Sequence, residues 1–263
     1  MGPVKTMNSM GELLKRLLTR YPSVYEKSRM PYAACRFYLR KPHDRDYGAF
    51  SLFPGRNGLF LDVGANAGQS AFSFRIYCRE NPILSLEPNP FHEADLKFAS
   101  RIVHRHQYLL IGAGNDRKDT ELFVPIYRGV PLTPEASLDR EEVLSSKSLM
   151  RRIGGSVNMS DVRLEPIRVS IQLVDELNLS PDFVKLDLQG HEFAALQGMA
   201  QTLERSSPVM LIETPDSRCR ELLASAGFSP YTFDQRRANL APETKPVTNV
   251  VFLREDAWAE VSA

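Results

Sequence analysis

The segment Gly58-Leu-Phe-Leu-Asp-Val-Gly-Ala-Asn-Ala-Gly-Gln-Ser70 predicts a short buried strand, a glycine-containing turn and the start of a helix. An apolar run over residues 59–63 that leads directly into glycines is typical of a parallel strand entering a nucleotide-binding turn. Gly64 and Gly68 give the turn conformational freedom and let a ligand approach the backbone. The strand carries Asp62 to its carboxyl end, where open α/β sheets bind their ligands.

The same turn indicates which cofactor it would hold. A nicotinamide-binding turn has the spacing G-x-G-x-x-G, but Asn66 and Gln69 stand where its second and third glycines would fall. Asp62 would repel a pyrophosphate, whereas it would attract the amino and sulfonium groups of S-adenosylmethionine. We therefore predict S-adenosylmethionine as the cofactor, with contacts from Asp62, Gly64, Asn66 and Gly68.

The composition of the chain limits its class. The chain has 263 residues, of which 43% are apolar and 25% charged, as in ordinary soluble proteins. It has neither an apolar run near the ~20 residues of a membrane span nor a signal-peptide pattern. Cys35, Cys78 and Cys219 are scattered without a disulfide framework or metal-ligand spacing. We expect a cytoplasmic protein.

Charge is spread unevenly along the chain. Residues 1–50 hold ten Lys and Arg against four Asp and Glu, and the remainder holds 23 against 28. A basic N-terminus could face an anionic substrate, but a solvated basic helix on an acidic body is the favoured interpretation. An acidic body argues against a broad nucleic-acid contact surface.

The order of patterns predicts two parts. Residues 8–20 predict an amphipathic helix, and a basic, proline-punctuated stretch to about residue 57 predicts an irregular cap or lid over the site. From Leu59 onward, strands and helices alternate with short connections, which indicates a parallel sheet. We predict an N-terminal extension over 1–57 and one cofactor-binding domain over 58–263.

Individual elements follow from the periodicity of the sequence. Residues 127–165 lack clear periodicity and predict either a substrate loop or partial disorder, and regularity returns at Ile167. The predicted strands are 59–63, 83–87, 107–112, 119–125, 182–188, 208–213, 228–233 and 248–253. The predicted helices are 69–80, 91–101, 172–178, 191–204 and 216–226.

A second acidic strand end strengthens the cofactor prediction. Glu87 ends the strand 83–87 and lies 25 residues after Asp62, close to the ~20-residue interval at which an acidic residue meets a ribose in nucleotide folds. A carboxylate can accept hydrogen bonds from both ribose hydroxyls. We predict that Glu87 binds the ribose.

Charged residues concentrate in Asp182–Glu192, around the end of the strand 182–188. Strand periodicity puts Lys185 and Asp187 on one face. A buried lysine needs a partner, and its candidate partners are Asp187, Glu192, Glu213 and Asp62. The Lys185 pairing is most simply structural.

Four residues near the strand ends are our candidates for catalysis. Methyl transfer to a hydroxyl requires that the acceptor oxygen lose its proton, and Asp187 or His191 could take it. Glu192 and Glu213 would organise them. Asp187 and Glu213 could also share a divalent cation, but no dedicated metal spacing exists and we expect no metal.

Taken together, the motifs resemble the FkbM-type family of S-adenosylmethionine-dependent methyltransferases. The resemblance covers about residues 58–253, and its most specific part combines Asp182–Glu192 with the glycine turn. It implies a class I (Rossmann-like) α/β fold, a mostly parallel sheet with helices on both faces. The other matching pieces are Leu86–Asn89, Ala113–Asn115, Ala195–Gly198, Leu211–Glu213 and Asn249–Leu253.

The resemblance also implies an activity. Members look like O-methyltransferases that act on hydroxyls of small-molecule, sugar or lipid-linked acceptors, and Asn115 would lie beside the adenine. Gln189 stands where many relatives carry Glu. Two alternatives stay open: a nucleic-acid methyltransferase that uses the basic N-terminus, and a non-catalytic cofactor-binding module. A nicotinamide dehydrogenase is disfavoured by Asn66 and Gln69.

Overall fold

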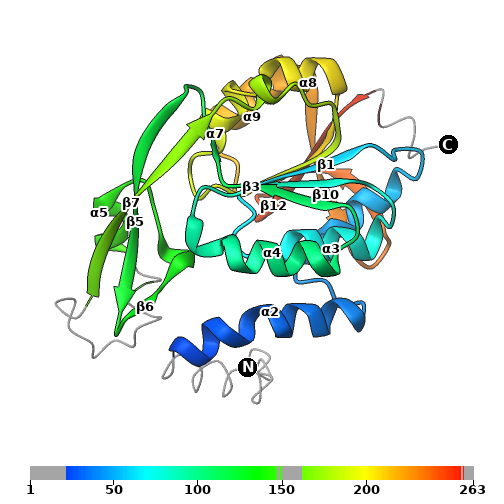
Figure 1. Cartoon of the computed structure of the whole chain (residues 1–263). Coiled ribbons are helices and arrows are strands. Elements are labelled where there is room, and N and C mark those ends of the chain that lie inside the picture. Colours follow the sequence, from blue (N-terminus) through cyan, green and yellow to red (C-terminus); the bar gives the residue numbers. More distant parts are fainter. Residues whose placement is uncertain (1–21, 147–148, 150–161, 256, 258–263) are drawn as a thin grey trace, which may run out of the picture. The chain divides into compact units, whose positions relative to one another are not determined.

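The computed structural model describes residues 22–146, 149, 162–255 and 257 (Figure 1). By its internal contacts the chain divides into two compact units. The smaller unit consists of Met1–Tyr32 and Glu121–Ile167, and the larger unit consists of Ala33–Thr120 and Arg168–Ala263. The predicted boundary at residue 57 stays a prediction.

The larger unit is built on an eight-stranded sheet with the order β11-β10-β12-β9-β8-β1-β2-β3. The five strands β9, β8, β1, β2 and β3 are parallel, whereas β12 is antiparallel to both β9 and β10. The chain order reverses between β1 and β8, which is where open α/β sheets bind ligands. The strands are β1 (Leu59–Val63), β2 (Ile83–Leu86), β3 (His106–Leu109), β8 (Pro181–Leu186), β9 (Val209–Glu213), β10 (Phe228–Asp234), β11 (Asn239–Pro242) and β12 (Asn249–Arg254).

Helices cover both faces of this sheet, as Figure 1 shows. On one face lie α3 (Gln69–Tyr77) and α4 (Glu93–Ile102), and on the other lie α7 (Glu192–Gln197), α8 (Ala200–Ser206) and α9 (Ser217–Ser225). The sheet and its two helical layers confirm the predicted fold class. In particular, β1 and the start of α3 coincide with the predicted residues.

Aromatic side chains form the core on the α3 face. Phe60 of β1 stacks on Phe74 of α3 with 3.9 Å between ring centroids, and Phe50 and Phe183 pack edge-on around them. All four are essentially inaccessible to solvent. Burying each such side chain stabilises the fold by about 1.5–3 kcal/mol, which fixes β1, and hence the turn that follows it.

The predicted helix 191–204 is wrong as a single helix. It ends at Gln197 and resumes as α8 at Ala200. Asp175 caps the second helix, because its carboxylate accepts hydrogen bonds from the amides of Gln201 and Thr202. Gly198 marks the break, since a Cβ there would lie 1.8 Å from the Gly114 carbonyl oxygen.

The extension that we expected to be helical and irregular is more helical than the proline-punctuated stretch to residue 57 suggested, among the residues that the structure describes. They form helix α2 (Pro22–Tyr38), which continues past Pro31, and the 3-10 helix η1 (Arg45–Leu52). Asp44 begins η1 by accepting a hydrogen bond from the Asp46 amide. The predicted helix over 8–20 lies outside the described residues.

Four further strands form a second sheet with the order β4-β7-β5-β6. The region predicted to be irregular, 127–165, therefore contains strands and the short helix α5 (Arg140–Ser145), although 147–148 and 150–161 are not described. Predicted helix 172–178 is instead the 3-10 helix η5 (Val174–Leu177). The strands are β4 (Gly112–Ala113), β5 (Lys118–Tyr127), β6 (Val130–Pro131) and β7 (Val162–Gln172).

Candidate active site

The turn between β1 and α3 has a backbone that requires its glycines. Gly64 and Gly68 have φ values of +81° and +86°, and Asn66 has +50°, which asparagine tolerates better than most residues. A Cβ on Gly64 would lie only 2.0 Å from the carbonyl oxygen of Asp187. The turn after β1 and the segment after β8 therefore touch, and only glycine permits that contact.

Asp62 lies beneath this turn and is fully buried. Its Oδ2 accepts hydrogen bonds from the hydroxyls of Ser70 at 2.6 Å and Ser85 at 3.0 Å. Its Oδ1 has no hydrogen-bond partner among the described residues. These bonds tie the first turn of α3 and strand β2 to β1. The predicted contact between Asp62 and the cofactor stays a prediction.

Lys185 is the positive centre of the site. Its ammonium group donates to the Gly64 carbonyl at 3.0 Å and lies 3.1 Å from Asp187 and 3.8 Å from Asp62, the residue opposite it on β1. Burial disfavours the charge, but Asp187 and Asp62 outweigh burial and raise the pKa of Lys185. Two of the four predicted partners of Lys185, Asp187 and Asp62, are thus confirmed. These ion pairs and the bond to Gly64 hold the turn after β1 in place.

Glu87 follows β2 and is nearly buried, with 8% of its surface exposed. One carboxylate oxygen accepts the Asn66 amide at 2.8 Å and the other accepts the Asn89 amide at 2.9 Å. Burial raises the pKa of Glu87. Each oxygen keeps a lone pair for a further donor, so the carboxylate is oriented for a second contact.

Asn89 adds an unmet donor beside Glu87. Its Oδ1 accepts the Phe91 amide, whereas its buried Nδ2 has no hydrogen-bond partner within the described part of the chain. Asn115, by contrast, is exposed and donates to Gln197 of α7 at 3.1 Å. Its predicted place beside an adenine stays a prediction.

Asp187 follows β8 and Glu213 ends the neighbouring strand β9, and the two carboxyl groups influence each other's pKa. Burial opposes ionisation of Asp187, but Lys185 outweighs burial and lowers its pKa. Burial, the hydrogen bond to Asp187 and the charge on Asp187 raise the pKa of Glu213 to about 7. A carboxyl group whose pKa lies near neutral pH can act as a general base.

The other two predicted catalytic residues open α7. The carboxylate of Glu192 accepts the amides of Leu188 and Gly190, at 2.7 and 2.9 Å, and so orders the turn after β8. His191 precedes α7 and is partly exposed. Among the described residues, no hydrogen bond or ion pair joins its ring to Asp187 or Glu213. The structure therefore brings Asp187 and Glu213 into interaction, whereas a role for His191 beside them stays a prediction.

A cavity of about 420 Å³ opens above the carboxyl pair. Residues that our sequence reasoning missed line much of it, because only tertiary packing brings them to the strand ends. The one hint was the expectation of an N-terminal cap over the site. The missed residues are His43, Asp44, Arg45, Tyr47, Gln235, Thr248 and Asn249.

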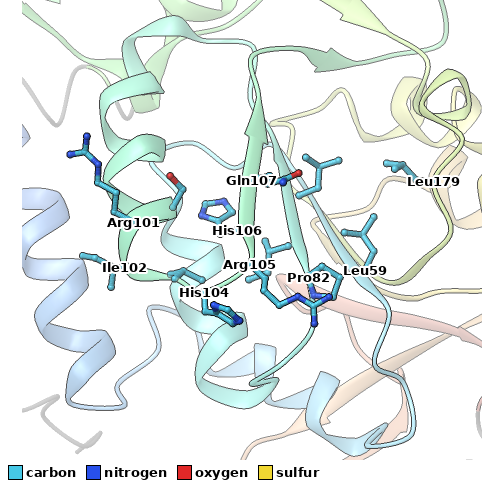
Figure 2. A pocket seen from close by; sticks show the side chains of 13 residues that line it. Leu59, Pro82, Arg101, Ile102, His104, Arg105, His106, Gln107 and Leu179 are labelled. Carbon is cyan, nitrogen blue, oxygen red and sulfur yellow. The ribbon is translucent and has the colours of Figure 1, made fainter.

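Figure 2 shows a larger cavity of about 740 Å³ at the opposite end of the sheet. Its lining includes Leu59, Pro82 and Gln107, which lie at or near the amino ends of β1, β2 and β3. No candidate site residue borders it. We therefore place the site at the carboxyl ends of the strands.

The described residues give no sign of a metal centre or a membrane span. No group of three His, Cys, Asp or Glu side chains in the described ranges could hold a metal ion. None of the described helices is both long enough and apolar enough to cross a membrane.

Comparisons with known proteins give one family match. The sequence model of the methyltransferase FkbM domain matches residues 62–230. No curated protein sequence matches the chain.

Several solved structures resemble the chain at low identity. Methyltransferase FkbM from Methylobacillus flagellatus KT is 15% identical, with 84% of this chain and 53% of that chain covered and a TM-score of 0.46. The chain thus spans about half the length of that methyltransferase. The precorrin-6y C5,15-methyltransferase from Geobacter metallireducens GS-15 is 12% identical, with 80% and 88% covered and a TM-score of 0.41. A TehB-like SAM-dependent methyltransferase from Corynebacterium glutamicum is also 12% identical, with 89% and 100% covered and a TM-score of 0.41.

Proposed function

The chain belongs to the FkbM family of methyltransferases, and from that premise we propose that it transfers a methyl group from S-adenosylmethionine to a hydroxyl of a small-molecule, sugar or lipid-linked acceptor. The observation that carries this proposal is the Asp187–Glu213 pair, because transfer to a hydroxyl needs a base that is active near neutral pH. Transfer to an already neutral amine would not need one.

The residues around the glycine turn fit the cofactor. Gly64 leaves no room for a side chain, Glu87 presents two fixed acceptor oxygens, and Asn89 has a buried donor without a partner. A ribose diol offers two donors and further acceptor oxygens, which complements both side chains. Glu87 would hold the ribose, and Gly64, Asn66 and Gly68 would shape the turn against the cofactor.

Bound S-adenosylmethionine would supply the electrophilic methyl group. The chain's own residues would then position the acceptor and remove its proton. Glu213 would accept the proton that the acceptor hydroxyl loses as it takes the methyl group, and S-adenosylhomocysteine would be the leaving group. Lys185 keeps Asp187 ionised and fixed in place. Glu192 orders the turn that carries Asp187 toward the cofactor.

The test of this function is the identity of the methylated atom. We expect the full chain, given S-adenosylmethionine with a ¹³C-labelled methyl group and a panel of hydroxyl compounds, to produce a labelled O-methyl ether. NMR separates O-, N- and C-methyl carbons by chemical shift. The control is the same reaction without an acceptor, which should leave the label on the donor. A product labelled only on nitrogen, carbon or nucleic acid would contradict the proposal, as would cofactor binding without turnover.

A further inference from the structure

The cavity above the carboxyl pair has a floor and a wall of different origin. Lys185, Asp187 and Glu213 on the floor lie within residues 62–230, the region that matches the family. The wall consists of residues that all lie outside that region: His43, Asp44, Arg45, Tyr47, Gln235, Thr248 and Asn249. The wall therefore comes from parts of the chain outside the segment that the family model matches.

Two carboxylates in and behind the wall are held in fixed positions by side-chain amides. Asn249 donates from one nitrogen to Asp44 at 2.6 Å and to Asp46 at 3.0 Å. Gln235 donates to the other oxygen of Asp46 at 2.8 Å, and Asp44 also caps η1. Since Asp44, Asn249 and Gln235 line the cavity, this network makes the wall both rigid and negatively charged.

Tyr47 gives the cavity an unmet polar group. It is 2% exposed, and its ring packs against Phe50 and Phe60. Its hydroxyl lies beside Ser70, which already donates to Asp62. Within the described residues, that hydroxyl has no hydrogen bond of acceptable geometry. A buried hydroxyl in this position costs free energy unless a ligand satisfies it.

Positive charge does not balance the wall. Lys185 is already engaged with Asp62, Asp187 and the Gly64 carbonyl. Desolvation and the charge of Lys185 lower the pKa of His43, and the ordinary histidine pKa of about 6.5 already leaves the ring mostly neutral at pH 7. Among the residues that line the cavity, this leaves the exposed Arg45 as the remaining cation.

We infer that the wall formed by His43–Tyr47, Gln235 and Asn249 binds the methyl acceptor and selects acceptors that present hydrogen-bond donors over anionic ones. The inference rests on the proposed function, which supplies the transferred methyl group. Asp44 would accept hydrogen bonds from the acceptor, and Tyr47 would bond to it from the buried side. A phosphate or carboxylate would be repelled by Asp44, Asp46 and the ionised member of the floor pair.

A matched pair of probes tests this selection. Methyl α-D-glucopyranoside and its 6-phosphate are titrated calorimetrically into the full chain saturated with S-adenosylhomocysteine. We expect the phosphate to bind about tenfold or more weakly than the neutral glucoside. We call the ratio of the two dissociation constants the affinity gap. Asp44→Asn should reduce this affinity gap by roughly three- to tenfold, because asparagine still caps η1 but carries no charge. Tyr47→Phe should weaken binding of the neutral glucoside about two- to tenfold without changing the affinity gap between the two probes.

Two controls separate selection from misfolding. Asp44→Asn should keep nearly the urea-unfolding midpoint of the unaltered chain, because asparagine still caps η1. Glu204→Gln on α8 removes an exposed charge that does not line the cavity, and it should change the binding affinity of neither probe.

The outcomes also separate this inference from the proposed function. If S-adenosylhomocysteine binds but the phosphate binds as tightly as the glucoside, or neither probe binds, the inference fails while the proposed function stands. The inference also fails if Asp44→Asn and Tyr47→Phe leave the binding affinities of both probes unchanged. Absence of S-adenosylhomocysteine binding overturns both.

Discussion

Gly64→Ala is expected to abolish detectable binding of S-adenosylmethionine and to destabilise the fold. The new Cβ would lie 2.0 Å from the Asp187 carbonyl oxygen, at a φ of +81° that alanine rarely adopts. Backbone strain contributes about 1–3 kcal/mol, and forcing the two segments apart adds about 1–3 kcal/mol. The displaced segments carry both the cofactor turn and Asp187. Calorimetric titration and urea unfolding measure the two effects.

Gly190→Ala is the matched control for that variant. Gly190 also has a positive φ, +100°, but a Cβ there meets nothing within 4 Å. Gly190→Ala should therefore suffer only the backbone strain, which lowers the free energy of unfolding by about 1–3 kcal/mol, and it should still bind the cofactor. Equal loss of binding in both variants would show that the contact between Gly64 and Asp187 does not shape the cofactor site.

Glu213→Gln is expected to lower kcat by roughly 10²- to 10⁴-fold, the usual contribution of a general base. In the unaltered chain, kcat should rise as the pH increases through about 7, because the pKa of Glu213 is raised to about 7 and the proton-accepting form exists above it. The inflection belongs to the coupled pair rather than to one residue. The variant should lose this rise, while its KM for S-adenosylmethionine stays nearly constant.

Glu221→Gln, an exposed carboxylate on α9, is the comparison for the pH profile. It should keep both the rate and the inflection. If Glu213→Gln retained the rise in kcat near pH 7 and His191→Gln lost it, the proton acceptor would be His191. His191 is one of the two bases, with Asp187, that the sequence predicts.

Local patterns were sufficient to predict much of the fold. The buried run 59–63 and the glycines after it predicted β1 and the start of α3 correctly, because apolar runs and glycine positions act locally. The break between α7 and α8 could not be predicted, since it depends on Asp175 reaching the amides of Gln201 and Thr202 from another element. Strand β11 was missed for a similar reason: its pairing with β10 is what orders it.

The site was predictable only where its residues follow strands. Sequence position was enough to select Asp187 and Glu213 as candidates, but the effect of each carboxyl group on the other's pKa depends on β8 and β9 being neighbours in the sheet. The predicted partners of Lys185 were correct for Asp62, which lies opposite it on the adjacent strand β1, and for Asp187, which directly follows β8. Asp44, Tyr47 and Asn249 reach the cavity through long-range packing, and no local pattern marks them.

Calorimetric titration of the full chain with S-adenosylmethionine, and separately with NAD, tests the central claim most directly. The account predicts saturable one-to-one binding of S-adenosylmethionine and no binding of NAD. It also predicts at least tenfold weaker binding of S-adenosylmethionine by Glu87→Ala, which removes the oriented carboxylate. An absence of heat with S-adenosylmethionine, binding of NAD in its place, or unchanged affinity in Glu87→Ala would contradict it.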